Sequence, residues 1–248
     1  MGSYSRMQSL ILLVFLFEFY AVATASSFDF YYFVQQWPGS FCDTKRGCCY
    51  PLTGKPASDF SIHGLWPNYK TGKWPQFCNS SNEFEFSQIS DLVEELNEYW
   101  GSLSCPSSNG HRFWEHEWEK HGTCSLNLNQ HEYFDKALSL RRKIDILGAL
   151  KFAGIRPDGA EYRVSDIKEA IRDATGELPG VDCNVSEEGE SQLFEIYVCV
   201  DKFDASTIIK CPLYPHSRCA STVKFPPFGD EEDLVESSNE QKIAGSDD

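Results

Sequence analysis

The chain has 248 residues, of which 37 are acidic and 22 are Lys or Arg, giving a formal net charge of −15 at pH 7. This length suits one domain, because no shift in composition divides the sequence before its final segment. The negative charge excludes a protein that binds long duplex nucleic acid tightly through its phosphates, since such proteins present clustered Lys and Arg.

Residues 1–25 have the layout of a secretory signal peptide. Arg6 precedes an apolar run at 10–17, and the segment ends in the small residues at 23–25. The run is shorter than the roughly 20 apolar residues that a membrane-spanning helix needs, which argues against the alternative of a membrane anchor. We therefore expect cleavage before Ser26 and a mature protein outside the membrane.

Two strands are predicted early in the mature chain. Residues 28–37 are rich in aromatic and β-branched side chains and end at Pro38. In residues 60–65, His63 alternates with apolar side chains and faces away from the core, until Gly64 interrupts the pattern. His63 is therefore a candidate site residue at a strand end.

A helix is predicted at 86–100, because apolar side chains recur there at helical spacing. Ser87 or Ser90 is the expected N-terminal cap. Further along the chain we expect one or two helices at 131–152, a helix at 164–175 and a strand at 193–200. This irregular order of helices and strands favours an α+β domain over a doubly wound parallel sheet.

Residues 113–121 predict a helix with one chemically unusual face. A residue advances about 100° around a helix, so five polar or aromatic side chains share an arc of about 140°. They are Phe113, His116, Glu117, Lys120 and His121. Trp114 and Trp118 border the arc and can anchor the helix, which ends at Gly122. A surface helix with simple ion pairs is the alternative, but the addition of His63 favours a functional site.

The sequence HEWEKH within this helix differs from the zinc-binding motif HExxH. His116 and His121 are five residues apart, about 140° around the helix, whereas two ligands of one zinc ion need the i, i+4 spacing. Lys120 lies between them and would repel a dication. We therefore predict no metal and no other cofactor.

All ten cysteines follow the proposed cleavage point, and none lies in a CxxC pair. Five disulfides formed in an oxidising compartment are expected, while the spacing leaves their pairing open. Sequons at Asn79 and Asn184 fit the same secretory route, although many sequons stay unmodified.

Residues 229–248 form an acidic tail. They hold eight acids and one lysine, a net −7, and since residues 1–25 are neutral, residues 26–228 carry −8. The tail has no aromatic residue and is predicted to be disordered, either as a solvated end or as a sorting signal. The remaining −8 is compatible with a turnover enzyme, which needs positive charge only where the reacting group binds.

The segments FSIHGLWP at 60–67 and FWEHEWEKHGTC at 113–124 together resemble the two active-site segments of the ribonuclease T2 family, in particular plant S-like ribonucleases. The resemblance covers about residues 28–228. It implies a single disulfide-rich α+β domain at 26–228, with a central antiparallel sheet flanked by helices. It also implies the disulfides Cys42–Cys48, Cys49–Cys105, Cys78–Cys124, Cys183–Cys219 and Cys199–Cys211.

The same resemblance implies a role for each residue of the two segments. His63 matches the general acid, His121 the general base, and His116 a histidine that contacts phosphate. Glu117 and Lys120 match the pair that stabilises the transition state. The resemblance further implies that Gln36 and Phe113 contact a base, whereas we expect Trp66 to serve packing.

Two histidines, a lysine and a glutamate, without a nucleophilic Ser or Cys, suit a substrate that supplies its own nucleophile. In RNA, the ribose 2′-hydroxyl attacks phosphorus when one group takes its proton and another protonates the leaving 5′-oxygen. A histidine pKa of about 6.5 allows both roles at mildly acidic pH, with a bell-shaped profile centred at about 5 to 6.5. DNA lacks this hydroxyl and should be inert.

The resulting hypothesis is a secreted or vacuolar, metal-independent endoribonuclease that acts on single-stranded RNA as a monomer. The alternative from another class is a storage or defence protein on the same scaffold with weak or no catalysis. A metallohydrolase is the third possibility, and a chelator distinguishes it from the first.

Overall fold

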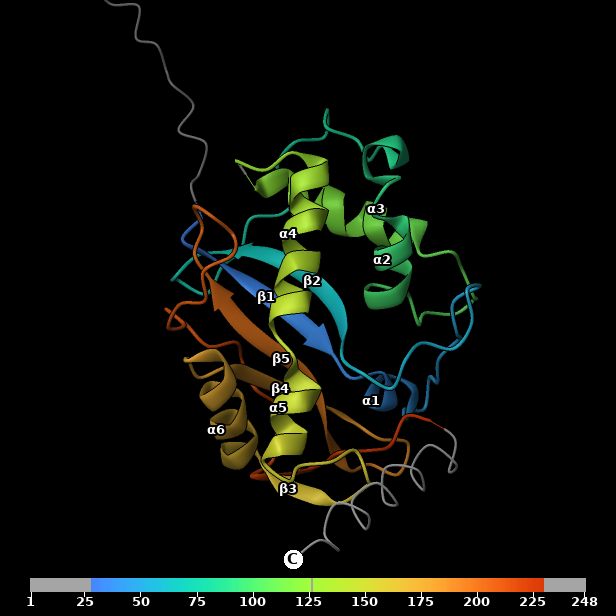
Figure 1. The fold of residues 1–248 in the computed structure, drawn as a ribbon, viewed down its shortest axis with the longest axis vertical. Coiled ribbons are helices and arrows are strands. Elements are labelled where there is room, and N and C mark those ends of the chain that lie inside the picture. Colours follow the sequence, from blue (N-terminus) through green and yellow to red (C-terminus); the bar gives the residue numbers. More distant parts are fainter. Residues whose placement is uncertain (1–27, 126, 230–248) are drawn as a thin grey trace, which may run out of the picture.

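A computed structural model describes residues 28–125 and 127–229. They form one six-stranded sheet with helices packed on it (Figure 1). The predicted signal peptide and nearly all of the predicted acidic tail lie outside the described residues. None of the described helices is long and apolar enough to cross a membrane.

The strands come in two groups along the chain, two before the central helices and four after them. They are β1 (Phe30–Gln36), β2 (Ser61–Asn68), β3 (Glu161–Arg163), β4 (Gly180–Val185), β5 (Ser191–Val200) and β6 (Thr222–Lys224). The helices are α1 (Pro38–Cys42), α2 (Val93–Tyr99), α3 (His111–Lys120), α4 (Gln130–Lys143), α5 (Ile146–Phe152) and α6 (Val164–Thr175). Two 3₁₀ turns are η1 (Phe86–Ile89) and η2 (Gly122–Cys124).

The sheet has the order β2-β1-β5-β6-β3, and β4 pairs with the other edge of β5. All pairings are antiparallel except that of β5 with β6, which is parallel and joins one residue pair. The expected α+β class is therefore confirmed, while the sheet is mixed rather than wholly antiparallel. β3, β4 and β6 were not predicted. Two of them have only three residues each, too few for a clear alternation.

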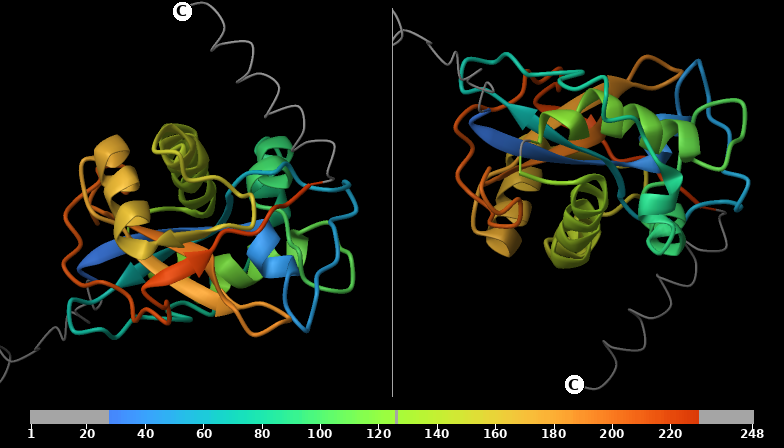
Figure 2. Two further views of the ribbon diagram at one scale, coloured as in Figure 1. Left: turned by 90° about the horizontal axis from the view of Figure 1, so that it is seen from below. Right: turned by 90° about the horizontal axis from the view of Figure 1, so that it is seen from above.

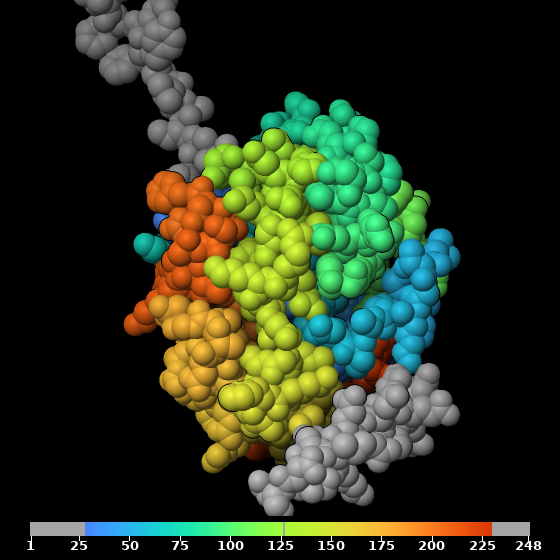
Figure 3. All heavy atoms as spheres, in the orientation of Figure 1, coloured from blue at the N-terminus to red at the C-terminus, as the bar shows by residue number. Residues whose placement is uncertain are grey.

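Helices α4, α5 and α6 lie along one face of the sheet, as the two turned views of Figure 2 and the outer surface in Figure 3 show. The main core lies between this layer and the sheet, and α3 adds Trp114 and Trp118 to it, both with 0% exposure. A smaller apolar cluster on the opposite face includes Tyr32, Tyr197 and the Cys199–Cys211 disulfide. The predicted anchoring of α3 by its two tryptophans is confirmed.

A β-bulge in β2 sets the direction of His63. Val34 of β1 pairs with Gly64, and Gln35 pairs with Ile62, so His63 is an extra residue without a partner on β1. A bulge redirects the side chains around it. Ile62 consequently lies in the core while His63 lines a cavity, which confirms that the alternation is interrupted at this point.

The prediction of one continuous helix at 86–100 is wrong. The segment is divided into η1 and α2, and the N-cap of α2 is Leu92 rather than a serine. Two separate contacts with α4 hold the pieces, because the Gln130 side chain bonds the backbone of Glu85 and Arg142 pairs with Glu95. Tertiary contacts have therefore overridden the local periodicity.

All ten cysteines are paired in the structure. The disulfides are Cys42–Cys48, Cys49–Cys105, Cys78–Cys124, Cys183–Cys219 and Cys199–Cys211, the pairs that the resemblance implies. Three of them join loops to η2, β4 and β5, one joins α1 to the loop that follows it, and Cys49–Cys105 joins two loops.

The two sequons differ in their surroundings. Asn79 is exposed in a loop and stays a predicted glycosylation site. Asn184 lies in β4, where its Nδ2 donates to the carbonyl of Ser40 at 2.7 Å and its Oδ1 is buried. The glycosylation of Asn184 stays a prediction, because a glycosylated side-chain amide keeps one N–H with which it can donate to Ser40.

Arg141 ties α4 to the beginning of β2, because its guanidinium donates to the buried carbonyl of Phe60 at 3.0 Å and to Asp59 at 2.5 Å. We expect Arg141→Met to lower the free energy of unfolding by about 2 to 4 kcal/mol, since charged hydrogen bonds typically contribute about 1.5 to 3 each. Arg142→Met, at the neighbouring exposed arginine, should cost less than about 1 kcal/mol. Equal losses in urea unfolding would contradict this account.

Candidate active site

Strand β2 and helix α3 meet at a cavity of about 750 Å³. All five residues with predicted acid–base or charge-stabilising roles line this cavity, namely His63, His116, Glu117, Lys120 and His121. Phe113 lines it as well. The remaining lining comes from β1, the rest of β2, β5 and two loops, including Tyr32, Asn68, Trp74, Tyr197, Tyr214 and His216. The structure thus brings together residues that are up to 58 positions apart in the two motifs.

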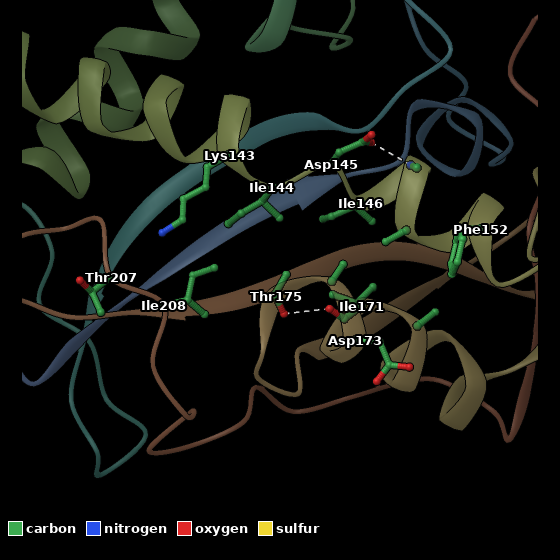
Figure 4. Close-up of a pocket in the computed structure, with 14 residues that line it drawn as sticks. Lys143, Ile144, Asp145, Ile146, Phe152, Ile171, Asp173, Thr175, Thr207 and Ile208 are labelled. Carbon is green, nitrogen blue, oxygen red and sulfur yellow. Dashed lines mark hydrogen bonds between the residues drawn. The ribbon is translucent and has the colours of Figure 1, made fainter.

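A second cavity, of about 640 Å³, lies between α5 and α6. Figure 4 shows isoleucine side chains, among them Ile144, Ile146 and Ile171, lining this space. Its charged side chains are Lys143, Asp145 and Asp173, and it contains no histidine. The acid–base chemistry therefore belongs to the first cavity.

His63 is held at both its backbone and its ring. The Trp100 indole donates to the His63 carbonyl at 3.0 Å, and the ring Nδ1 lies 2.5 Å from Oε1 of Glu195 on β5. Burial lowers the pKa of His63, but the hydrogen bond and charge of Glu195, aided by the charge of Glu117, raise it by more. The net pKa lies above the ordinary value, so His63 is set up to carry a proton.

His121 lies directly after α3, and it has the opposite character. Its side chain is 5% exposed, its Nδ1 has no hydrogen-bond partner, and its ring stacks on Trp66 with centroids 5.2 Å apart. Burial, with the nearby charges of Lys120 and the other histidines, lowers the pKa of His121 to about 2. His121 is therefore neutral at ordinary pH, which is the form that a proton acceptor needs.

Glu117 is buried beneath the cavity, with 2% exposure. Its Oε2 accepts a hydrogen bond from the Trp66 indole at 2.8 Å. Burial raises the pKa of Glu117 to about 7, against the opposing effects of His63, Trp66 and Lys120. Below that pH its carboxyl group is neutral and does not repel a bound anion.

Gly64 leaves the space in which this hydrogen bond forms. A Cβ at position 64 would lie 2.0 Å from the Trp66 indole nitrogen and 2.3 Å from the Glu117 carboxylate. The glycine of FSIHGLWP is therefore required by close approach of side chains, in addition to its place in the bulged strand.

His116 and Lys120 lie on the outer part of the same helix face. His116 is largely exposed, and its partial burial together with the charge of Lys120 lowers its pKa. Glu115 and Glu119 line a different cavity behind α3, as the predicted helix face requires. Among residues 28–125 and 127–229, no group of three or more His, Cys, Asp or Glu side chains is arranged to hold a metal ion.

Trp66 and Gln36 both differ in their surroundings from what the sequence predicts. The expectation that Trp66 serves packing is incomplete, because its indole is half-buried and contacts Glu117, His121 and His63. Gln36 is 3% exposed and does not line the cavity, so its contact with a base stays a prediction. It lies in β1 beside Glu195 of β5, where main-chain pairing places it next to the site.

The sequence reasoning missed Glu195 and Tyr197. In the otherwise apolar strand LFEIYVCV, these side chains share one face, and a glutamate in a central strand is unusual enough to be a signal. That signal gives no partner, because the pairing of β1 with both β2 and β5 is needed to bring Glu195 to His63.

Comparisons with known proteins agree with this geometry. The sequence model described as the Ribonuclease T2 family matches residues 28–211. Extracellular ribonuclease LE of Solanum lycopersicum is 48% identical over 231 residues, covering 92% of this chain and 100% of that protein. Intracellular ribonuclease LX of the same species is 53% identical over 212 residues, covering 85% of this chain and 89% of that protein.

A solved structure is similar as well. The crystal structure of RNase NT in complex with 5′-AMP has a TM-score of 0.78 and 53% sequence identity. The match covers 81% of this chain and 99% of that chain.

Gly64→Ala should break the bond between Trp66 and Glu117, because the new methyl group occupies its space. We expect the Trp66 indole proton to lose its protection from hydrogen exchange in NMR spectra, and the unfolding free energy to fall by about 1 to 3 kcal/mol. Gly101→Ala is the control for a smaller steric change, since a Cβ there would make tight contacts at 3.3 Å without overlapping its neighbours. An unchanged Trp66 signal in Gly64→Ala would contradict the assigned contact.

Proposed function

The chain belongs to the ribonuclease T2 family and is a T2-type ribonuclease, and from this premise we propose that it cleaves single-stranded RNA internally by attack of the substrate's own 2′-hydroxyl. The observation that carries the proposal is the pair His63 and His121. Both rings contact Trp66 in one cavity, and their pKa values are shifted in opposite directions by their surroundings.

In the proposed first step, neutral His121 takes the proton of the 2′-hydroxyl as its oxygen attacks the neighbouring phosphorus. Protonated His63 gives its proton to the 5′-oxygen as the bond from phosphorus to that oxygen breaks. The products are a 2′,3′-cyclic phosphate and a free 5′-hydroxyl. Water then opens the cyclic phosphate to a 3′-phosphate with the two histidine roles reversed.

Positive charge for the phosphorane-like transition state comes from Lys120 and, when protonated, His116. Glu117 supports this arrangement in two ways. It fixes Trp66, whose ring contacts both reacting histidines. Below a pKa of about 7 it is also neutral, so it does not repel the phosphate as an ionised carboxylate would.

The aromatic lining supports an unpaired base as the preferred partner. Phe113 lies 6.0 Å from the His63 ring, and Trp74 is 55% exposed at the cavity's edge. Such faces can stack on bases of any sequence, which suits single-stranded RNA. A stacked duplex does not present its bases in this way.

We propose the secretory route, with the mature protein acting as a monomer outside the cell or in a vacuole. The signal-like segment at 1–25 and the five disulfides support this route. The two tomato relatives, called extracellular and intracellular in their names, leave both destinations open.

Product analysis tests the nucleophile. A dinucleoside monophosphate should yield a 2′,3′-cyclic phosphate and then a 3′-phosphate at about pH 5, equally with and without EDTA, because the chemistry uses histidines and the ribose hydroxyl. Its 2′-deoxy counterpart should stay intact. Cleavage of the deoxy compound would contradict the mechanism, loss with EDTA would favour a metallohydrolase, and an inactive protein would favour the storage or defence alternative.

His121→Ala should reduce kcat by about 10² to 10⁴, since it removes one proton transfer. His131→Ala is the matched control, because His131 is exposed on α4 and pairs with Asp91 away from the cavity. Rates with the dinucleotide substrate should stay near those of the unaltered protein in this control. Similar losses in both variants would point to a general effect on folding.

A further inference from the structure

Glu195 holds His63 in a way that neither the motifs nor the proposed reaction assigns. Its Oε1 lies 2.5 Å from Nδ1 of His63, and its Oε2 accepts the hydroxyl of Tyr197 at 2.6 Å. Glu195 is 5% exposed, so both of its oxygens are used within the protein. A carboxylate bound to Nδ1 requires the proton on that nitrogen, which leaves Nε2 as the atom that reaches substrate.

A neighbouring ion pair, Asp182 with Arg218, leaves the charge of Glu195 available to His63. Asp182 is the partner of Glu195 across the β4–β5 pair and is also buried. Arg218 donates to Asp182 from its backbone at 2.8 Å and from its guanidinium at 2.6 Å. Burial raises the pKa of Asp182, but these bonds from Arg218 lower it overall, so its negative charge is matched locally. Glu195 is therefore free to pair with His63.

The charged groups around His63 come from two elements. Glu195 and the hydroxyl of Tyr197 face it from β5, while Glu117, Lys120 and the two other histidines face it from α3 and its end. His121 has no comparable carboxylate, and its Nδ1 is unpaired. The two imidazole rings are chemically identical, and this difference in partners shifts their pKa values in opposite directions.

We propose that Glu195 is the positioning residue that makes His63 the acid of the pair and sets the pH at which activity is lost on the alkaline side. This inference rests on the proposed function. A carboxylate that favours the imidazolium keeps His63 protonated to higher pH, so activity should persist above the ordinary histidine range and fall only as His63 deprotonates.

Glu195→Gln preserves size but removes the charge. With the dinucleotide substrate, kcat/KM should fall about tenfold or more at pH 8 and by less than about threefold at pH 5, because a pKa lower by one shifts the acid form tenfold. Glu190→Gln is the matched control, since that carboxylate is exposed next to β5 and pairs with Lys224. Its pH profile should follow that of the unaltered protein. Identical profiles for Glu195→Gln and the control would overturn the proposal.

Histidine NMR separates this inference from the proposed function. The pKa of His63 should be lower in Glu195→Gln even if the protein cleaves no RNA, and an unchanged value overturns the inference while leaving the ribonuclease activity intact. If the variant fails to fold, the unaltered protein decides. Its His63 Nδ1 proton should resonate far downfield, as in imidazole–carboxylate pairs, and an ordinary shift would overturn the proposal.

Discussion

The contacts of one side chain, Trp66, hold the candidate site together. Its indole donates to the buried Glu117, its face stacks on His121, and its ring lies edge-on to His63. Trp66 belongs to β2, as His63 does, whereas Glu117 and His121 belong to α3 and its end. The strand and the helix therefore meet at this aromatic ring, and Gly64 keeps the space beside it open.

This arrangement gives two identical residue types different chemistry. A buried imidazole ordinarily loses affinity for its proton, and His121 shows that effect without compensation. His63 lies in the same cavity but contacts a carboxylate that is itself held by Tyr197. The difference between the two histidines thus comes from Glu195 and Tyr197 on β5, a strand that lies outside both motifs. The negative charge of the whole chain is irrelevant to this balance, because only groups within the cavity act on the rings at short range.

The sequence was sufficient to predict the α+β class, the main helices and the residues that gather in the cavity, because periodicity fixes which side chains share a helix face or a strand face. It was insufficient where distant contacts decide the outcome. The helix at 86–100 is divided by contacts with α4. Glu195 was missed for the same reason, since its partner lies 132 positions away in the chain. Family resemblance, rather than spacing, supplied the disulfide pairs.

The central claim is that, before any substrate binds, His63 is protonated while His121 in the same cavity is neutral. An NMR titration of the histidine rings in the unaltered protein tests it most directly. The account predicts that His63 stays protonated beyond the ordinary histidine range, while His121 stays neutral far below it. Two rings that titrate together near the ordinary value of about 6.5 would contradict it.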